Sequence, residues 1–393
     1  MHGSDQLGHG SSQAADAGEA ATAAVQEALG GRTPTAADLV LVFPTIDYDP
    51  HQFFAAAQRA AGDAQVVGCT SFRSFTSTAN LQRGAVAVHL PAGGLSFGIA
   101  LHDEIGRDVL GAAQAVTATA RDRAGPDAGH PVLLMLSDGF AGDQRAVVRG
   151  AYTVAGATVP IIGGAAAENL SMTQTFQYAE GRVATNGLIA VWINSPRPLG
   201  IGVEHGWHAI GDPMIVTRAK RNIIHELDGR PAVEVYLSQR GTDLPPGVRE
   251  GLWDRPFARA ALGHPLGLAD ALGRFAGRHI LDRTPDGGLA MFGHVTEQSV
   301  VQVMAGDHGD LLDAAARSGA DAAAQLGRPA RGALVFSCAG RVHPLGEHIE
   351  AEAVAVQAGT GGAPIAGFFT YGEFARVTGS TGFHNATVVT LAL

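Results

Sequence analysis

The chain has 393 residues, a formal net charge of −10 and only two cysteines. This length allows two domains of ordinary size, and the acidic balance excludes a general nucleic-acid or anionic-membrane surface, which needs clustered Lys and Arg. Charged residues make up 16%, against about 25% in an average soluble domain, while glycine is abundant at 53 residues, which favours a compact core crossed by tight turns.

The N-terminal segment, residues 1–30, lacks the cationic start and apolar run of a signal peptide. We expect a mobile tail that leads into a short Ala-rich helix ending at Gly30 and Gly31. No window of about 18 residues is continuously apolar, so no transmembrane helix is predicted. The two distant cysteines form neither a metal-ligand spacing nor a disulfide framework, which fits a reducing compartment, and we therefore expect a cytoplasmic protein.

Three segments of the chain share one order of signals, in which an apolar strand, a helix and a second strand follow each other. The expected strand pairs lie at 38–45 and 64–71, at 131–139 and 159–169, and at 332–338 and 363–373. Asp49 can cap the first intervening helix and Pro50 suits its first turn. A crossover that contains a helix joins parallel strands, so each pair is predicted to be parallel. A further apolar strand closes each segment, at 83–90, 186–193 and 385–393.

The pattern predicts an α/β fold of repeated strand-helix-strand units in mixed, largely parallel sheets, arranged as two associated domains with a cleft between them. A strand and an Ala-rich helix also precede the second and third segments, from about residues 95 and 299. Two prolines within 193–202 indicate a domain boundary near residue 198, so the domains are expected at 31–198 and 199–393. Residues 238–290 are rich in Pro, Gly and Arg and are interpreted as an irregular connection with short helices.

Ligands of open α/β sheets gather beyond the carboxyl ends of the parallel strands. The loops expected there are rich in Gly, Ser, Thr and Cys, which allow close approach of a ligand to the backbone. Cys338 could act as a nucleophile with His343 as its base. A small strand-end cysteine is more often buried and inert, however, and we favour this structural interpretation for Cys338 and Cys69.

Other catalytic motifs are incomplete. The stretch "IIHELDG" at 223–229 lacks the second histidine of a zinc protease and is expected to form a charged helix beside a turn at Asp228 and Gly229, with Pro231 starting the next helix. Neither a Walker loop nor a G-x-S-x-G elbow is present. We therefore predict no enzyme activity and no metal site, with a cysteine-dependent hydrolase as a distant alternative.

Several longer stretches resemble the FIST proteins. They are "VVGCTSF", "IIGGAAAENLSMTQTFQYAEGRV", "VTRAKRNIIHELDGRPAVEVYL", "ALVFSCAGR" and "GAPIAGFFTYGEFARVTGSTGFHNATVVTLAL". The resemblance spans roughly residues 31–393 and implies a FIST N domain followed by a FIST C domain, a sensory module of prokaryotic signalling that binds small ligands, with amino acids a leading suggestion. Many relatives continue the first "GC" with a Ser/Thr, Gly and acidic pattern, whereas this chain has Phe72, Arg73 and Phe75, so we expect an altered pocket in the first half.

The resemblance also implies how a signal would leave the protein. Family members often accompany kinases or cyclic-di-nucleotide enzymes, and this chain has no room for such an output domain. We expect the signal to pass to a separate partner, such as a histidine kinase or a cyclic-di-nucleotide enzyme. Some family members are haem proteins that sense nitric oxide, so a non-covalently bound haem b is the alternative to a sensor without a cofactor.

The candidate ligand-binding residues come from the loops that follow the expected strands. They are Gly68, Cys69, Thr70, Gly163, Gly164, Cys338, Arg341, Tyr371, Glu373, His384 and Asn385. For an amino-acid ligand, the guanidinium fork of Arg341 matches the carboxylate and Glu373 matches the ammonium; alternatively, these two side chains pair with each other. For haem, His384 would be the ligand in an apolar slot that Phe368, Phe369, Phe374 and Phe383 could line, whereas the ordinary alternative is a loop histidine bonded to the backbone.

Overall fold

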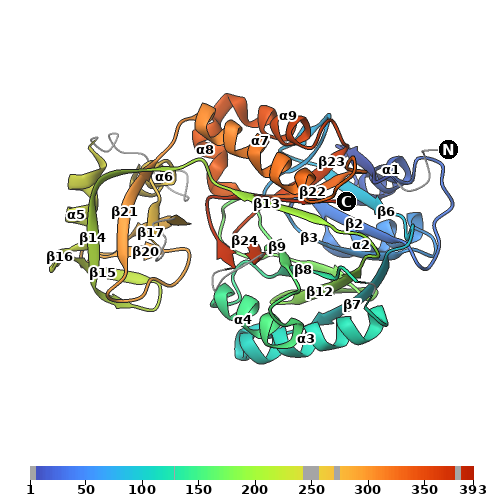
Figure 1. Cartoon of the computed structure of the whole chain (residues 1–393), viewed down its shortest axis with the longest axis horizontal. Helices are drawn as coiled ribbons and strands as arrows, with labels where there is room; N and C mark the ends of the chain where they lie inside the picture. Colours follow the sequence, from blue (N-terminus) through green and yellow to red (C-terminus); the bar gives the residue numbers. More distant parts are fainter. Residues whose placement is uncertain (1–5, 128, 242–255, 270–274, 377–381) are drawn as a thin grey trace.

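The protein consists of a large body and a smaller lobe to one side of it (Figure 1). The computed structural model describes residues 6–127, 129–241, 256–269, 275–376 and 382–393. Within these residues the body contains three six-stranded sheets, and a fourth sheet of eight strands forms the lobe. The expectation of a mixed α/β fold is confirmed.

The three sheets of the body have the same strand order and the same pairing directions. The first sheet runs β1 (Gly8–Ser12), β6 (Ala85–Leu90), β2 (Leu39–Pro44), β3 (Gln65–Cys69), β10 (Gln177–Ala179) and β11 (Arg182–Ala184). The second runs β7 (Ser96–His102), β12 (Leu188–Asn194), β8 (Val132–Ser137), β9 (Ile161–Ala165), β24 (Glu373–Arg376) and β25 (Phe383–His384). The third runs β13 (Gly200–Glu204), β26 (Val388–Ala392), β22 (Ala333–Cys338), β23 (Ile365–Thr370), β4 (Ser74–Thr76) and β5 (Asn80–Leu81).

One pair of strands in each of these sheets is parallel, as predicted for the three segments: β2 with β3, β8 with β9, and β22 with β23. The neighbouring pairs are antiparallel, including the closing strands β6, β12 and β26 against β2, β8 and β22. The expectation of largely parallel sheets is therefore wrong, because the closing strands and the edge hairpins return without a crossover. Descent of the three segments from one repeated unit stays a prediction.

Edge hairpins interlock the three sheets. The hairpin β4–β5 follows β3 in the chain but pairs with β23, β10–β11 follows β9 but pairs with β3, and β24–β25 follows β23 but pairs with β9. Side chains from the inner faces of all three sheets meet in one central core that contains Leu41, Phe43, Leu134, Phe336 and Phe368. The sheets therefore share their apolar interior.

Each sheet of the body also has a pair of helices on its outer face. These pairs are α1 (Ala17–Leu29) with α2 (Pro50–Ala60), α3 (Val109–Ala124) with α4 (Gln144–Ala155), and α7 (His308–Ala324) with α9 (Ile349–Gly359). The expected caps are present, because Asp49 accepts a hydrogen bond from the Gln52 backbone and Gly30 ends α1 in the left-handed conformation. The remaining single turns of helix in the body are η1 (Ile105–Arg107), η2 (Ala339–Arg341), α8 (Val342–Leu345) and η3 (Gly346–His348).

Glycines allow the parallel strands to approach. A Cβ atom would lie 2.0 Å from the Val42 carbonyl oxygen at Gly68, 2.0 Å from that of Met135 at Gly163, and 1.9 Å from that of Val335 at Gly367. Gly163 also has a φ of +130°, which disfavours other residues. Gly68 and Gly163, two of the predicted ligand-binding residues, are thus required by the packing of the sheets.

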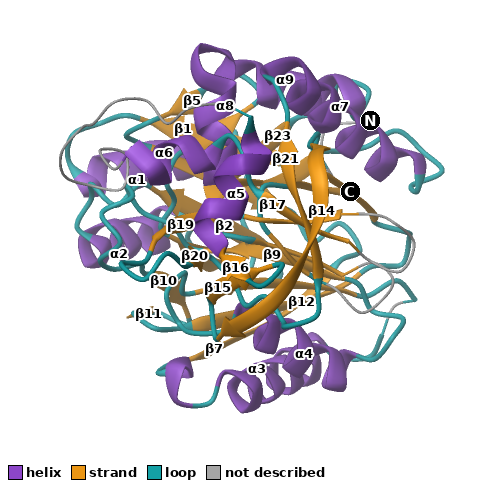
Figure 2. Cartoon of the chain, turned by 90° about the vertical axis from the view of Figure 1, so that its left-hand side faces the viewer, coloured by secondary structure: helices purple, strands orange, loops and turns teal. Residues whose placement is uncertain are grey.

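The lobe is inserted between β13 and α7, so the chain leaves the body near residue 205 and returns near residue 307 (Figure 2 looks onto it). Its strands are β14 (His208–Lys220), β15 (Ile223–Leu227), β16 (Arg230–Pro231), β17 (Leu266–Ala269), β18 (Phe275–Arg278), β19 (Ile280–Arg283), β20 (Leu289–Met291) and β21 (Val300–Ala305), and its helices are α5 (Ala232–Arg240) and α6 (Pro256–Leu262). A core around Val216, Ile224, Tyr236 and Val303 holds them together.

The structure of the lobe differs in several places from what the sequence led us to expect. Residues 223–227 form the strand β15 instead of a helix, although Asp228 and Gly229, both with positive φ, make the expected turn. The segment 238–290, expected to be irregular, contributes four strands in its described parts, and residues 242–255 and 270–274 lie outside the described residues. The strand expected to precede α7 in the body is β21 of the lobe, and β13 takes the equivalent place beside β26.

The N-terminal segment also differs from the expectation. Residues 8–12, interpreted as part of a mobile tail, form β1 and pair in register with residues 85–89 of β6. Residues 1–5 of the expected tail lie outside the described residues. The predicted boundary near residue 198 falls just before β13, which joins the third sheet of the body, and this boundary stays a prediction.

Candidate functional site

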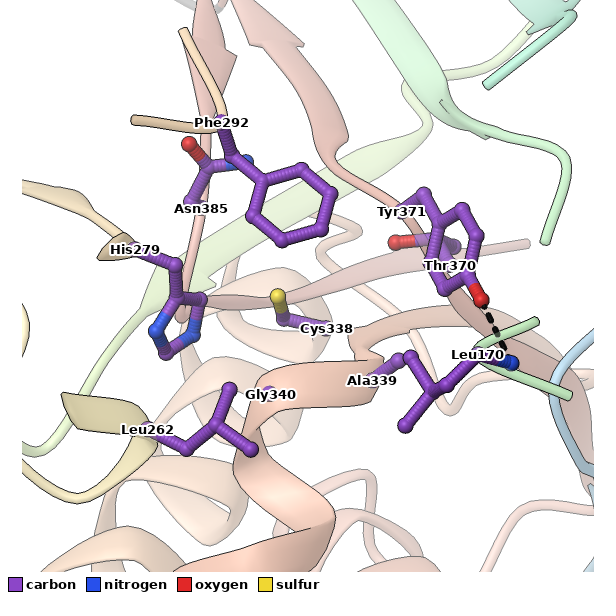
Figure 3. Close-up of a pocket in the computed structure, with 10 residues that line it drawn as sticks. All are labelled: Leu170, Leu262, His279, Phe292, Cys338, Ala339, Gly340, Thr370, Tyr371 and Asn385. Carbon is purple, nitrogen blue, oxygen red and sulfur yellow. Dashed lines mark hydrogen bonds between the residues drawn. The ribbon is translucent and has the colours of Figure 1, made fainter. Parts of the chain in front are cut away.

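A small pocket with about 20 Å³ of internal space lies where the lobe meets the body, at the carboxyl ends of β22 and β23 (Figure 3). The body contributes Leu170, Cys338, Ala339, Gly340, Thr370, Tyr371 and Asn385, and the lobe contributes Leu262, His279 and Phe292. We call this cavity the junction pocket. Its space suffices for about one water molecule and is far below the range of about 300–1,000 Å³ for small-molecule sites, so a larger ligand requires the lobe to move away from the body.

Two polar side chains of the junction pocket have no hydrogen-bond partner among the described residues. The Asn385 side chain is 1% exposed, and neither its Nδ2 nor its Oδ1 is bonded. His279 is 2% exposed, and neither of its ring nitrogens is bonded. An unsatisfied buried polar group costs about 1–3 kcal/mol. Buried polar groups in native proteins are nearly always paired, so these two point to a partner that is not part of the chain.

His279 is held as a neutral imidazole. Burial, reinforced by the nearby Arg341 charge, lowers the pKa of His279 to about 4. A Cβ atom at position 340 would lie 2.0 Å from Nε2 of the ring, so Gly340 provides the space that the imidazole occupies. Near neutral pH the ring therefore presents one N–H donor and one acceptor nitrogen.

Tyr371 fixes one wall of the pocket. Its hydroxyl donates to Oε1 of Glu168 at 2.8 Å and accepts from the Leu170 amide at 2.9 Å, which is the bond drawn in Figure 3. Glu168 in turn accepts hydrogen bonds from the backbone amides of Ser171 and Met172. This network ties the loop after β9, which includes Leu170 at a φ of +65°, to the end of β23.

Arg341 does not line the pocket. It is fully buried, and its Nε donates to Oε1 of Glu352 at 2.7 Å, while Nη1 donates to the His205 carbonyl and Nη2 to the Leu311 carbonyl. The second carboxylate oxygen of Glu352 accepts from the Ser337 hydroxyl at 2.9 Å. The predicted alternative pairing of Arg341 with Glu373 is wrong, because Glu352 on α9 occupies the guanidinium.

Glu373 lies behind the pocket wall. Its Oε1 accepts from the Thr370 hydroxyl at 2.5 Å and its Oε2 from the Thr387 hydroxyl at 2.6 Å. Burial raises the pKa of Glu373 to about 7, against the opposing effect of these hydrogen bonds. Of Glu373, Thr370 and Thr387, only Thr370 lines the pocket. The Glu373 carboxyl therefore does not contact the space where a ligand ammonium would lie.

The two cysteines are buried thiols. Burial raises the pKa of both well above its ordinary value, with the Glu373 charge as a further cause at Cys338. Cys338 lines the junction pocket, whereas Cys69 belongs to the central core of the body. Since the thiolate is the nucleophilic form, this environment disfavours a cysteine-dependent hydrolase.

The expected haem slot around His384 does not form. Nε2 of His384 bonds the Ala375 carbonyl at 3.0 Å, as in the backbone-bonded alternative, and burial lowers the pKa of the ring to about 4. The four phenylalanines proposed to line the slot are divided among three cores: Phe374 and Phe383 share one, whereas Phe368 stacks on Phe43 and Phe369 packs edge-on against Phe75 in two others. The residues present therefore do not fit a haem at this position.

The remaining predicted residues lie in the sheets. Gly164 makes room for Thr370, whose Cγ2 would be 2.5 Å from a Cβ atom there. The Thr70 hydroxyl accepts from the Phe176 amide at 3.1 Å. Arg73, in the "TSFRSF" loop that differs from the family pattern, donates to Asn80. The pocket thus brings together three of the predicted residues, namely Cys338, Tyr371 and Asn385.

Sequence reasoning missed the lobe's share of the pocket. Leu262 and His279 lie in the segment 238–290, which was expected to be irregular, and Phe292 lies just after it. The adjacent polar pair Arg278 and His279 inside the otherwise small and apolar "FAGRHIL" is the available signal, because a short strand rarely buries two such side chains without a reason. Thr370 was missed although it directly precedes Tyr371.

The described residues also lack two features that would bear on function. None of their helices is long and apolar enough to cross a membrane. Within the same residues, no group of three or more His, Cys, Asp or Glu side chains is placed to hold a metal ion.

Family models match most of the chain. The model of the FIST N domain matches residues 38–230 and that of the FIST C domain residues 232–376. An uncharacterized protein of Mycobacterium tuberculosis is 29% identical over 97% of this chain and 98% of its own length. An uncharacterized protein of Mycobacterium bovis is 30% identical over 58% of both chains, and one of Methanocaldococcus jannaschii is 29% identical over 38% of this chain and 30% of its own.

Proposed function

The chain belongs to the FIST family, whose domains are sensory domains associated with signal transduction, and from this premise we propose that it senses a small polar ligand bound in the junction pocket. The ligand is a small molecule without net charge, such as an amino acid in its zwitterionic form, and the lobe moves away from the body to admit it, because the space present is about 20 Å³. The observation that carries this proposal is the pair of unsatisfied side chains, Asn385 and His279, at the carboxyl ends of the parallel strands.

The lining supports a ligand without net charge. All lining side chains are neutral when His279 is uncharged, and an ion buried there without a counter-charge would carry a large desolvation cost. The Asn385 amide offers two donors and an acceptor oxygen, and the imidazole offers one donor and one acceptor. The carboxylate of a zwitterion can accept a hydrogen bond from the Asn385 amide nitrogen, and its ammonium can donate one to the Asn385 amide oxygen. One zwitterion therefore satisfies both the donor and the acceptor of Asn385.

The apolar lining supports a ligand with a small apolar part. Leu170, Leu262, Phe292 and the ring of Tyr371 surround the polar pair. Phe292 and Tyr371 lie with ring centroids 6.0 Å apart, one from the lobe and one from the body. These side chains favour an aliphatic or aromatic substituent over a strongly polar one.

The position of the pocket links ligand binding to the arrangement of the lobe and the body, and thereby to signalling. Its lining comes from both the lobe and the body, so a bound ligand contacts both and favours the more open arrangement that accommodates it. We expect a separate intracellular protein, such as a histidine kinase or a cyclic-di-nucleotide enzyme, to recognise that arrangement. The residue Leu170 comes from the part matched by the FIST N model and most other lining residues from the part matched by FIST C.

A thermal-shift screen over the amino acids and their amides tests the proposal, because a ligand that binds only the folded state raises the melting temperature. We expect at least one compound to stabilise the wild type and Asn80→Leu, a matched change in the distant strand β5, but not Asn385→Leu. Equal stabilisation of Asn385→Leu, or no stabilisation by any of these compounds, contradicts the proposal.

A further inference from the structure

A second cavity, which we call the arginine pocket, lies between α4 and the hairpin β24–β25. It has a volume of about 820 Å³ and is lined by Asp143, Arg145, Ala146, Val148, Arg149, Tyr152, Arg278, Arg376, Gly382 and Phe383. Four arginines and one aspartate give this lining a formal charge of +3, in a chain whose net charge is −10. Positive charge is thus concentrated at this cavity against the overall charge of the protein.

Two of the four arginines are buried with unused donors. Arg278 is 4% exposed; its Nη1 donates to the Gly277 carbonyl at 2.8 Å, but its Nε has no partner among the described residues. Arg376 is 7% exposed, and its Nη1 is likewise unpartnered within the described chain. Its guanidinium carbon lies 3.8 Å from the centroid of the Tyr152 ring, which leaves the edge of the guanidinium to make hydrogen bonds.

The aspartate of the cavity does not neutralise these two arginines. Both carboxylate oxygens of Asp143 accept from Arg145, at 3.1 Å each, and the side chain also caps α4. Arg278 instead lies 5.9 Å from the centroid of the Phe383 ring. Burial, with the neighbouring Arg145 charge, lowers the pKa of Arg278 to about 10, so the group is still cationic at neutral pH. The charges of Asp143 and Glu373 offset this lowering only in part, so the buried cation is under-compensated, which favours an anion that is not part of the chain.

We propose that the arginine pocket binds a compact anion with two or more negative charges, namely the phosphate group of a small molecule. Guanidinium groups match phosphate oxygens in a bidentate fork, and the charge of the lining suits a dianion better than a monoanion. The rings of Tyr152 and Phe383 border the cavity and offer contact to the organic part of a phosphate ester. This inference does not depend on the sensory role proposed above.

The two pockets are neighbours, because the same two segments of the chain line both of them. Arg278 lines the arginine pocket and the next residue, His279, lines the junction pocket, while Phe383 and Asn385 are divided between them in the same way. A variant of one pocket can therefore be compared with a variant of the other. Asn385→Leu should abolish the response to amino acids and keep the response to phosphate, which separates failure of this inference from failure of the proposed function.

Calorimetric titration with inorganic phosphate tests the inference, with sodium acetate at equal ionic strength as the monoanion control. We expect saturable phosphate binding by the wild type, at least tenfold weaker binding by Arg376→Gln, and no saturable acetate binding. Arg107→Gln, a change of an arginine whose side chain is 83% exposed and outside the cavity, should bind phosphate like the wild type.

A second variant, Arg149→Gln, controls for misfolding of Arg376→Gln. Arg149 is exposed at the rim, so Arg149→Gln should fold normally and still weaken phosphate binding, which keeps the test decisive if Arg376→Gln does not fold. The inference is overturned if phosphate does not bind saturably, if acetate binds as tightly as phosphate, or if the folded arginine variants bind phosphate as well as the wild type.

Discussion

Replacing Glu352 by glutamine tests the buried ion pair beneath the junction pocket. Glu352 is 1% exposed and accepts from Nε of Arg341 at 2.7 Å and from the Ser337 hydroxyl at 2.9 Å. Glutamine keeps the shape and one acceptor oxygen but removes the charge, which leaves Arg341, at 0% exposure, with backbone carbonyls and no counter-charge. Loss of one partner of a buried pair costs about 3–5 kcal/mol, so we expect the free energy of unfolding to fall by about that amount.

Urea unfolding of four proteins measures this effect. The double variant Arg341→Met/Glu352→Leu should recover most of the loss, because apolar residues of similar volume leave no uncompensated charge. Glu104→Gln, which removes a surface pair whose side chains are 62% and 83% exposed, should change stability by less than about 1 kcal/mol. A loss below about 1 kcal/mol in Glu352→Gln, or a double variant no more stable than the single, would refute the reasoning.

Three further predictions concern pH, backbone packing and haem. Burial raises the pKa of Glu373 to about 7 from an unfolded value of 4.5, so the folded state holds a proton that the unfolded state releases, and stability falls as pH rises through this window. Glu373→Gln should therefore gain roughly 3 kcal/mol relative to the wild type between pH 4 and pH 8 in urea unfolding; a constant difference would contradict this. Gly163→Ala, whose Cβ atom would meet the Met135 oxygen at 2.0 Å, should lower the melting temperature far more than Gly181→Ala, which has a positive φ but open space. Added haem should keep the broad absorption of free haem, because Nε2 of His384 is bonded to the backbone; a sharpened Soret band that shifts with nitric oxide and vanishes in His384→Ala would reverse this view.

Local signals predicted the elements of the body well. The cap at Asp49 follows from short-range chemistry, and the parallel pairing of three strand pairs follows from the length of the crossovers. The same signals failed in the lobe, where residues 223–227 carry charges that suggested a helix but pair as β15 with β14 and β20. Which strand pairs with which is a long-range property, and β-propensity depends on those partners.

The candidate site shows the same limit. The loops after β22 and β23 were expected to hold the ligand, and they do border the junction pocket through Cys338 and Tyr371. The partner of Arg341 could not be predicted, because η2 and α8 intervene before Glu352 and turn the chain back over the guanidinium. His279 reaches Asn385 only because the inserted lobe folds against the body, which no local pattern encodes.

Calorimetric titration of the purified protein with the amino acid or amide that gives the largest thermal shift is the most direct test of ligand sensing in the junction pocket. The account predicts one site per chain, which is kept in Asn80→Leu and lost in Asn385→Leu. It also predicts that ligand-free Asn385→Leu is more stable than the wild type by about 1–3 kcal/mol, because a buried unsatisfied amide is removed. Undiminished binding by a folded Asn385→Leu protein would contradict the account.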